Sequence, residues 1–343
     1  MEKFNKKPNF LKKYEVIISD YLKSSVLSYD GDISKYINNY FGWEDKDLVN
    51  SYQGKAFRPA LCIALCDSLN GDINAALPCS ISVELVHNFS LIHDDIEDND
   101  KLRRHKPTLW TIWGIPKALI TGNSILVLGN QKLEELLEYG ISKEKLFFSQ
   151  KLLTESYLKM MEGQFLDISF EKKSRISEDE YLKMIGLKTG ALIECSVILG
   201  AISSNKKLSN TELQLISDFG KDIGLLFQIR DDILGVWGTD KTGKPVGGDI
   251  KKKKKSLPII LTINSNSAYE KEINEIMKKN EIHEDDIKKF LNIMDKIDIK
   301  NKCDYIAEKY LSKIRNTISN IPTSQEHKKT FNEITNFLMS RET

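Results

Sequence analysis

The sequence has few cysteines and almost no net charge, and each shortage excludes a class of protein. The five cysteines among 343 residues are odd in number and form no C-x-x-C pair, which excludes a disulfide framework or a zinc ribbon and fits a reducing compartment. Lys and Arg number 50 against 49 Asp and Glu, so the basic excess of nucleic-acid binders is missing. We therefore expect no nucleic-acid partner.

Long apolar runs are also missing. No stretch reaches the roughly 18 uninterrupted apolar residues of a membrane span; residues 190–203 come closest, and Glu194 interrupts them. The amino terminus has charges with no apolar run behind them, unlike a secretory signal. Hydrophobic residues still make up 41% of the chain, which is enough for a core and excludes global disorder. We expect a cytoplasmic protein with no membrane span.

Proline is scarce, and its distribution indicates helices. The chain has eight prolines, with none between Pro116 and Pro245, and proline breaks helix interiors. Apolar residues recur at spacings of three and four in residues 152–168, 181–202 and 213–236, as in buried helices. No alternating strand pattern or internal repeat is evident. The sequence predicts an all-α protein with one domain over residues 1–343, in which residues 265–343 form peripheral helices.

Two acidic clusters end apolar helical runs. Five acids lie within residues 94–100, directly after the run 83–93, and Asp231 and Asp232 end a second run. On a helix Asp94 and Asp98 lie about 40° apart and His87 about 20° from Asp94, so they share one face. Clustered carboxylates with waters are what Mg²⁺ prefers, although a solvated acidic helix end is the plainer alternative. If the clusters face each other across a bundle, they would hold divalent ions and through them a diphosphate.

Basic residues accompany both clusters. Lys55 and Arg58 lie one turn apart at the start of a predicted helix, which suits an anion, and Arg103 and Arg104 follow the first cluster. Further cations are Lys188, next to Thr189; Lys244, in a glycine-rich loop typical of a mobile lid; and the run 251–255. We expect most of this run to be surface lysines, with Lys254 as the exception.

The chain resembles the trans-isoprenyl diphosphate synthases, the polyprenyl synthetase family that includes farnesyl and geranylgeranyl diphosphate synthases. The likeness covers roughly residues 50–260, where GKAFRP, ELVHNFSLIHDDIEDNDKLRR, GQFLDI, LKTG, FQIRDD and TGKPVGGDI follow the family's order. The resemblance implies antiparallel helices around a deep central cavity and a homodimer. It also implies Mg²⁺-assisted condensation of isopentenyl diphosphate with allylic diphosphates (dimethylallyl, geranyl or farnesyl).

The resemblance also implies a role for each matched residue. Three Mg²⁺ ions, replaceable by Mn²⁺, would be held by Asp94, Asp95, Asp98, Asp231 and Asp232. The allylic diphosphate would contact Arg103, Lys188, Lys244 and Lys254, and isopentenyl diphosphate would contact Lys55, Arg58, His87 and Arg104. Thr189 and Gln228 would lie beside the developing allylic cation, with Gln164 and Asp167 supporting the metal site. The released diphosphate would take the final proton.

Product length is expected to depend on the helix before Asp94. Helical geometry favours Ser90 and Val86 as wall residues, about 40° and 80° from Asp94. The family rule instead uses the fifth and fourth positions before that Asp, Phe89 and Ser90, and an aromatic followed by a small residue resembles the archaeal-type geranylgeranyl synthases. We expect mainly a C20 product, with C15 as the second candidate. Ordinary core packing is the alternative role for Phe89.

Departures from the family pattern leave other functions open. Gly235 stands where a third Asp is common, and His105, Trp110 and Asn123 also differ. A class I terpene cyclase or a non-catalytic partner subunit remain alternatives, although the isopentenyl diphosphate residues and both Asp pairs argue against them. A zinc site at His87 and His93 is disfavoured because the two lie about 120° apart on a helix. An oligonucleotide-binding role is disfavoured because no aromatic residues interleave with the lysine run.

Overall fold

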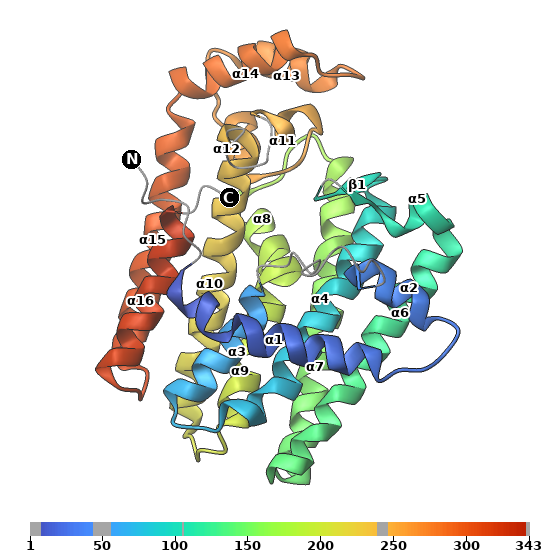
Figure 1. Cartoon of the computed structure of the whole chain (residues 1–343). Helices are drawn as coiled ribbons and strands as arrows, with labels where there is room; N and C mark the ends of the chain where they lie inside the picture. The colour runs from blue at the N-terminus through green and yellow to red at the C-terminus, as the bar shows by residue number, and fades with distance from the viewer. Residues whose placement is uncertain (1–7, 44–55, 105, 239–245, 341–343) are drawn as a thin grey trace. The chain divides into compact units, whose positions relative to one another are not determined.

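The computed structural model describes residues 8–43, 56–104, 106–238 and 246–340. Nearly all of these residues that belong to an element are helical, which confirms the all-α prediction (Figure 1). The only strands in this described part are the two-residue strands β1 (Leu102–Arg103) and β2 (Lys106–Pro107), which pair antiparallel. The sequence had shown no signal for this short ribbon, because two residues are too few for an alternating pattern.

Contacts divide the chain into two compact units. Unit 1 comprises residues 1–157, 195–216 and 322–324, and unit 2 comprises residues 158–194, 217–321 and 325–343. The single-domain organisation therefore stays a prediction. Unit 1 contains α1 (Asn9–Leu27), α2 (Ser34–Phe41), α3 (Phe57–Ser68), η1 (Ile73–Ala76), α4 (Leu77–Glu97), α5 (Leu109–Trp113), α6 (Ile115–Lys132) and η2 (Leu133–Tyr139).

Unit 2 contains α8 (Glu178–Ile185), the π-helical segment η3 (Gly186–Gly190), α11 (Gly248–Lys251), α12 (Leu257–Ile263), α13 (Glu270–Lys278), α14 (Glu284–Lys296), α15 (Ile299–Asn320) and α16 (Gln325–Ser340). The helices α7 (Lys143–Glu171), α9 (Ala191–Ser203) and α10 (Asn210–Trp237) each contribute residues to both units. The apolar spacing had predicted helices in all three of these regions, and each is present.

Helix α4 is the central element of unit 1 and packs against α1, α3 and α6. Its side chains are buried almost continuously from Leu77 to Phe89, as expected for a helix that is apolar all round. Gly129 of α6 allows α6 to approach α4 closely, because a Cβ added at this position would lie 3.1 Å from the carbonyl oxygen of Ser82. The hydroxyl of Ser82 donates a hydrogen bond to the Gly129 carbonyl. Helix α4 is thereby packed closely against α6 around Ser82.

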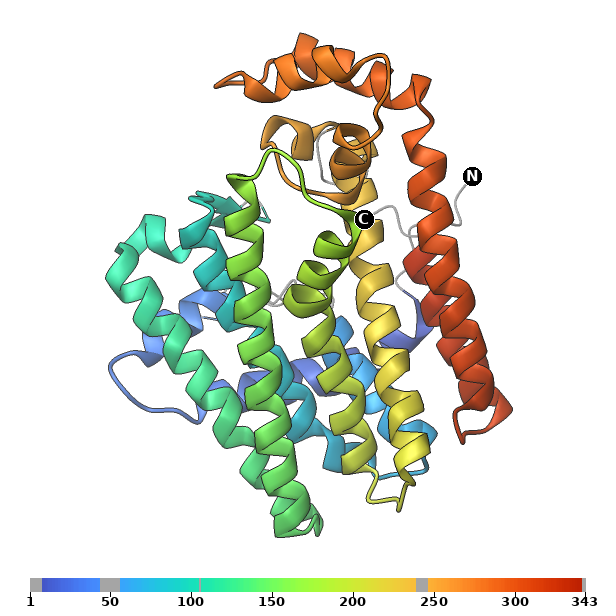
Figure 2. The same cartoon turned by 180° about the vertical axis from the view of Figure 1, so that it is seen from behind.

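One π turn, η3, connects α8 to α9 and lies in unit 2. Figure 2 shows the helices of the chain from behind. Glycines make room for this turn. A Cβ at Gly163 of α7 would lie 2.2 Å from the backbone nitrogen of Lys188, and one at Gly224 of α10 would lie 2.5 Å from the Cα of Gly190. Single π turns inside helices occur frequently at functional sites, and this one contains the LKTG motif.

The predicted carboxyl-terminal helices are present, and they contribute to the core of unit 2. Helix α15 packs against α12 and α16. Phe331 of α16 is 1% exposed, and its ring lies 5.1 Å from that of Phe219. Helices α15 and α16 bury their apolar faces within unit 2 and expose their polar faces, and their peripheral place stays a prediction.

Two stretches pass a length and hydropathy test for a membrane span, residues 73–97 and 178–203. Their apolar windows are 83% and 72% buried inside the protein. Core helices have this property as well, so both stretches are explained by packing.

Candidate active site

The first acidic cluster lies at the end of α4, as predicted. Asp94 and Asp95 belong to the last turn of the helix, and Asp98 is its C-cap, whose amide donates to the Asp94 carbonyl at 2.8 Å. Asp95 is only 4% exposed, and its carboxylate accepts a 2.7 Å hydrogen bond from Nε of Arg103. Burial raises the pKa of Asp95, and the nearby Arg103 opposes this rise. Asp95 therefore holds Arg103 in place.

The ribbon formed by β1 and β2 carries the arginine pair. Arg104 has φ of 51°, a left-handed conformation that costs a non-glycine residue about 1 kcal/mol or more. The loop before the ribbon is tied down at Asp100, whose carbonyl accepts from the hydroxyl of Thr108 at 2.9 Å and from the indole of Trp110 at 3.0 Å. Trp110, one of the departures from the family pattern, thus anchors the loop that follows the acidic cluster.

A group of buried and half-buried polar residues lies earlier along α4 and at the start of α3. Burial raises the pKa of Glu84 to about 7 and lowers that of Arg58 to about 10. The pKa of His87 lies well below its usual range because of burial and the nearby Arg58 and Arg104. Asn88 donates to the carbonyl of Glu84 at 2.7 Å. Arg58 and Arg104 therefore act electrostatically on His87, and all three residues were predicted to bind isopentenyl diphosphate. Lys55 lies outside the described residues.

The three residues predicted to set product length have different surroundings. Val86 is fully buried and lies 3.5 Å from where a Gly129 Cβ would be, so it packs against α6. Phe89 is 4% exposed, and its ring centroid lies 4.6 Å from that of His93. Ser90 is half-buried and donates its hydroxyl to the His87 carbonyl at 2.8 Å.

The second acidic cluster lies on α10, and its Asp232 is the centre of a hydrogen-bond network. Asp232 is 2% exposed and accepts from the hydroxyl of Tyr181 at 2.7 Å, from Nε2 of Gln228 at 2.9 Å and from the amide of Leu257 at 3.1 Å. Nζ of Lys254 lies 3.8 Å from the same carboxylate. Tyr181 was missed from the sequence, because a tyrosine in an apolar helical run looks like ordinary core.

The network extends into the π turn. The hydroxyl of Thr189 donates to the amide oxygen of Gln228 at 2.8 Å. Lys188 forms an ion pair of 2.6 Å with Asp167 of α7. Three predicted site residues, Thr189, Gln228 and Lys188, and the predicted supporting residue Asp167 thus form two bonded pairs within unit 2. Asp231, next to Asp232, is half-buried.

The lysine run after α11 is not uniform. Lys251 and Lys252 are exposed, as expected. Lys255 was expected at the surface, but it is only 8% exposed, and burial lowers its pKa. Lys254 alone of the run lies near Asp232. Lys244 lies outside the described residues.

The glycine at position 235 has a structural reason. A Cβ added to Gly235 would lie 2.4 Å from Oδ2 of Asp249, so the carboxylate of Asp249 occupies the space that a side chain at 235 would need. This oxygen is buried and has no hydrogen-bond partner among the described residues. Asp249 belongs to the motif TGKPVGGDI, and its position there was the only sequence signal for it. Of the other departures, Asn123 is exposed and His105 lies outside the described residues.

These residues fit Mg²⁺ as partial ligand sets. Within the described ranges, no three His, Cys, Asp or Glu side chains lie close enough to enclose an ion by themselves. Mg²⁺ commonly takes one or two carboxylates and completes its shell with waters and substrate phosphates. The half-buried Asp94 and Asp231 and the exposed Asp98 can be reached by a hydrated ion, whereas Asp95 and Asp232 are only 4% and 2% exposed.

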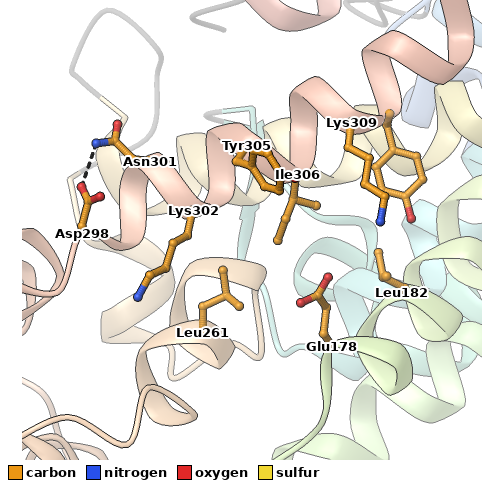
Figure 3. A pocket seen from close by; sticks show the side chains of 10 residues that line it. Glu178, Leu182, Leu261, Asp298, Asn301, Lys302, Tyr305, Ile306 and Lys309 are labelled. Carbon is orange, nitrogen blue, oxygen red and sulfur yellow. Dashed lines mark hydrogen bonds between the residues drawn. The ribbon is translucent and has the colours of Figure 1, made fainter.

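A pocket of about 460 Å³ lies elsewhere in unit 2, between α15 and residues of α8 and α12 (Figure 3). Its lining includes Lys302, Tyr305, Lys309 and Glu178. None of the predicted site residues lines it, and its basic and acidic side chains favour no single class of ligand.

Comparison with known proteins gives consistent matches. The polyprenyl synthetase family model matches residues 46–294. The chain is 36% identical over 250 residues to the (2E,6E)-farnesyl diphosphate synthase of Mycobacterium tuberculosis, covering 72% of this chain and 68% of the relative. It is 34% identical over 275 residues to the geranylgeranyl diphosphate synthase of Saccharolobus solfataricus, covering 80% and 82%. The crystal structure of a polyprenyl synthetase from Streptomyces coelicolor superposes with a TM-score of 0.87 at 28% identity, covering 96% and 98%.

Proposed function

The chain belongs to the polyprenyl synthetase family, and we propose that it is a short-chain trans-prenyltransferase that condenses isopentenyl diphosphate with allylic diphosphates. One observation carries the proposal. Each acidic cluster contains one buried Asp bound to protein donors, Asp95 to Arg103 and Asp232 to Tyr181 and Gln228. Next to it is an Asp that stays accessible, Asp94 or Asp231. An acidic helix end with a purely structural role would not need one buried and one accessible Asp side by side.

The chemistry explains these residues. Breaking the allylic C–O bond separates a carbocation from a diphosphate, so preorganised positive charge lowers the barrier. Arg103, Lys188 and Lys254 would supply such charge, and each is near a carboxylate that limits its motion. The hydrogen-bonded Thr189 and Gln228 offer dipoles that stabilise a cation without attacking it. The released diphosphate would take the final proton.

We assign the metal ligands to Asp94, Asp98 and Asp231. Bound Mg²⁺ would supply further positive charge to the leaving diphosphate. Asp95 and Asp232 would act by orienting Arg103 and Lys254, because both carboxylates are buried and lie next to these cations. Three ions, with Mn²⁺ able to substitute, are part of this proposal.

We propose a mainly C20 product, with C15 as the second candidate, and Phe89 as the residue that stops chain growth. The aromatic residue at this position and the small Ser90 beside it support the proposal. Phe89→Ala should lengthen the product, and Ser90→Phe should shorten it. Gas chromatography of the dephosphorylated products measures both.

A homodimer is the proposed assembly, and an exposed apolar stripe on α7 supports it. Leu158, Met161, Phe165 and Ile168 follow at spacings of three, four and three, with 39% to 69% of each side chain exposed. Such a stripe is typical of a helix that packs against another copy. Phe165→Glu should yield monomers in light scattering after size exclusion, whereas Tyr305→Glu, at an equally exposed position on α15 (74%), should not. We also place the enzyme in the cytoplasm; its five buried, free cysteines suit a reducing compartment.

The decisive test is incubation of the purified protein with isopentenyl diphosphate and each of dimethylallyl, geranyl and farnesyl diphosphate in Mg²⁺. The proposal expects turnover by this chain alone. Cyclised hydrocarbons formed without isopentenyl diphosphate would indicate a terpene cyclase, and no turnover without a second protein would indicate a partner subunit.

A further inference from the structure

His93 lies in a tight space between two helices of unit 1. It precedes the first Asp of the cluster on α4, and its side chain hydrogen-bonds the backbone of Leu119 on α6. The imidazole and the Phe89 ring have centroids 4.6 Å apart and planes inclined by 59°. Because the two residues are four apart on one helix, they are neighbours on the same face.

Gly122 of α6 bounds the imidazole on another side. A Cβ at this position would lie 2.7 Å from both Cδ2 and Nε2 of His93, which is closer than non-bonded atoms approach. Nε2 is also buried and has no hydrogen-bond partner within the described part of the chain. The imidazole is therefore placed by packing and by one backbone contact, with Phe89 against its ring and Gly122 beside it.

We propose that His93 is a positioning residue for product length, wedged between Gly122 and Phe89 so that the Phe89 ring stays where it stops the growing chain. The inference rests on the proposed function and on the role given there to Phe89. It assigns a role in product length to His93 on α4 and to Gly122 on α6. Neither residue would touch the substrate; both would act through Phe89.

The contacts give each substitution a direction. His93→Ala removes the ring against which Phe89 packs, so Phe89 can swing into the vacated space and the product should lengthen. Gly122→Ala drives a methyl group into the imidazole, which must shift toward Phe89, so the product should shorten. The methyl group clashes only with the imidazole and meets Ile92 at an ordinary 3.5 Å, so Gly122→Ala should have no effect on product length in a His93→Ala background.

The experiment measures the product distribution of the full-length enzyme with isopentenyl diphosphate and dimethylallyl diphosphate, together with the thermal midpoint of each variant. Gly129→Ala is the matched control. It lies two turns from Gly122 on α6 and also faces α4, but its added Cβ would press on Ser82 and Leu85, touch Val86 only at an ordinary 3.5 Å, and not meet His93. We expect it to lower the thermal midpoint and leave the C15 to C20 ratio unchanged. For His93→Ala and Gly122→Ala we expect that ratio to change at least threefold in opposite directions.

The outcomes distinguish a failure of the proposed function from a failure of the role given to His93. No condensation by the wild-type protein would overturn the proposed function itself. If the wild-type protein condenses its substrates but both His93→Ala and Gly122→Ala keep the C15 to C20 ratio, only this inference is overturned. The contact between His93 and Gly122 would then affect stability alone. An equal shift with Gly129→Ala would also overturn the inference, because general loosening of α6 would explain the effect.

Discussion

Gly163→Ala tests whether close packing against the π turn places the catalytic residues. The new Cβ would lie 2.2 Å from the nitrogen and 2.5 Å from the Cα of Lys188, and 2.8 Å from the carbonyl carbon of Leu187. All three are backbone atoms, which cannot rotate away. Restoring an ordinary contact of 3.4 Å requires α7 and η3 to separate by about 1 Å.

The expected cost follows from this displacement. Overpacking a core position costs about 1–3 kcal/mol, which in a protein of this size lowers the thermal midpoint by roughly 1–4 °C. Because η3 carries Lys188 and Thr189, and a displacement of about 1 Å can cost up to roughly 100-fold in rate, kcat should fall by about 10- to 100-fold.

Differential scanning calorimetry and steady-state kinetics measure the two effects. Gly186→Ala is the control, since it lies in the same π turn but its added Cβ would approach nothing closer than Leu225 at 3.7 Å. It should change both quantities little. A Gly163→Ala enzyme with a lowered thermal midpoint but wild-type kcat would refute the argument that this contact places the catalytic residues.

Four further predictions concern individual contacts. Tyr181→Phe removes one of three donors to Asp232 and should lower stability by about 1.5–3 kcal/mol in urea unfolding; the same change at the exposed Tyr305 should have no effect. Asp94→Asn and Asp231→Asn should reduce kcat by orders of magnitude while circular dichroism stays unchanged, and full activity in either variant would remove that residue from the metal site. Arg58→Ala should raise KM for isopentenyl diphosphate far more than for the allylic substrate, and equal effects would mean that the two subsites are exchanged. Burial raises the pKa of Glu84 from 4.5 to about 7, so the folded protein binds the proton more tightly and stability should fall by about 3 kcal/mol as pH rises between these values; Glu84→Gln should remove that part of the pH dependence.

The sequence determined much of the fold and of the candidate site. Apolar spacing predicted the helices that became α7, α8 to α9 and α10, because a buried helix needs apolar residues every three or four positions. The same rule placed Asp94 at the end of α4 and Asp231 and Asp232 on a buried helix. The family motifs are short and contiguous, so they could be recognised without knowing which helices meet.

Only the tertiary structure separated residues that look alike in the sequence. Asp94 and Asp95 are adjacent and chemically identical, yet Asp95 is buried against Arg103 because successive helical positions face different surroundings. Tyr181 reaches Asp232 from 51 positions away, and Asp249 fills the space beside Gly235. The imidazole of His93 has room only because position 122 on another helix has no side chain. Such contacts depend on how helices distant in sequence approach one another, which no local pattern of residues encodes.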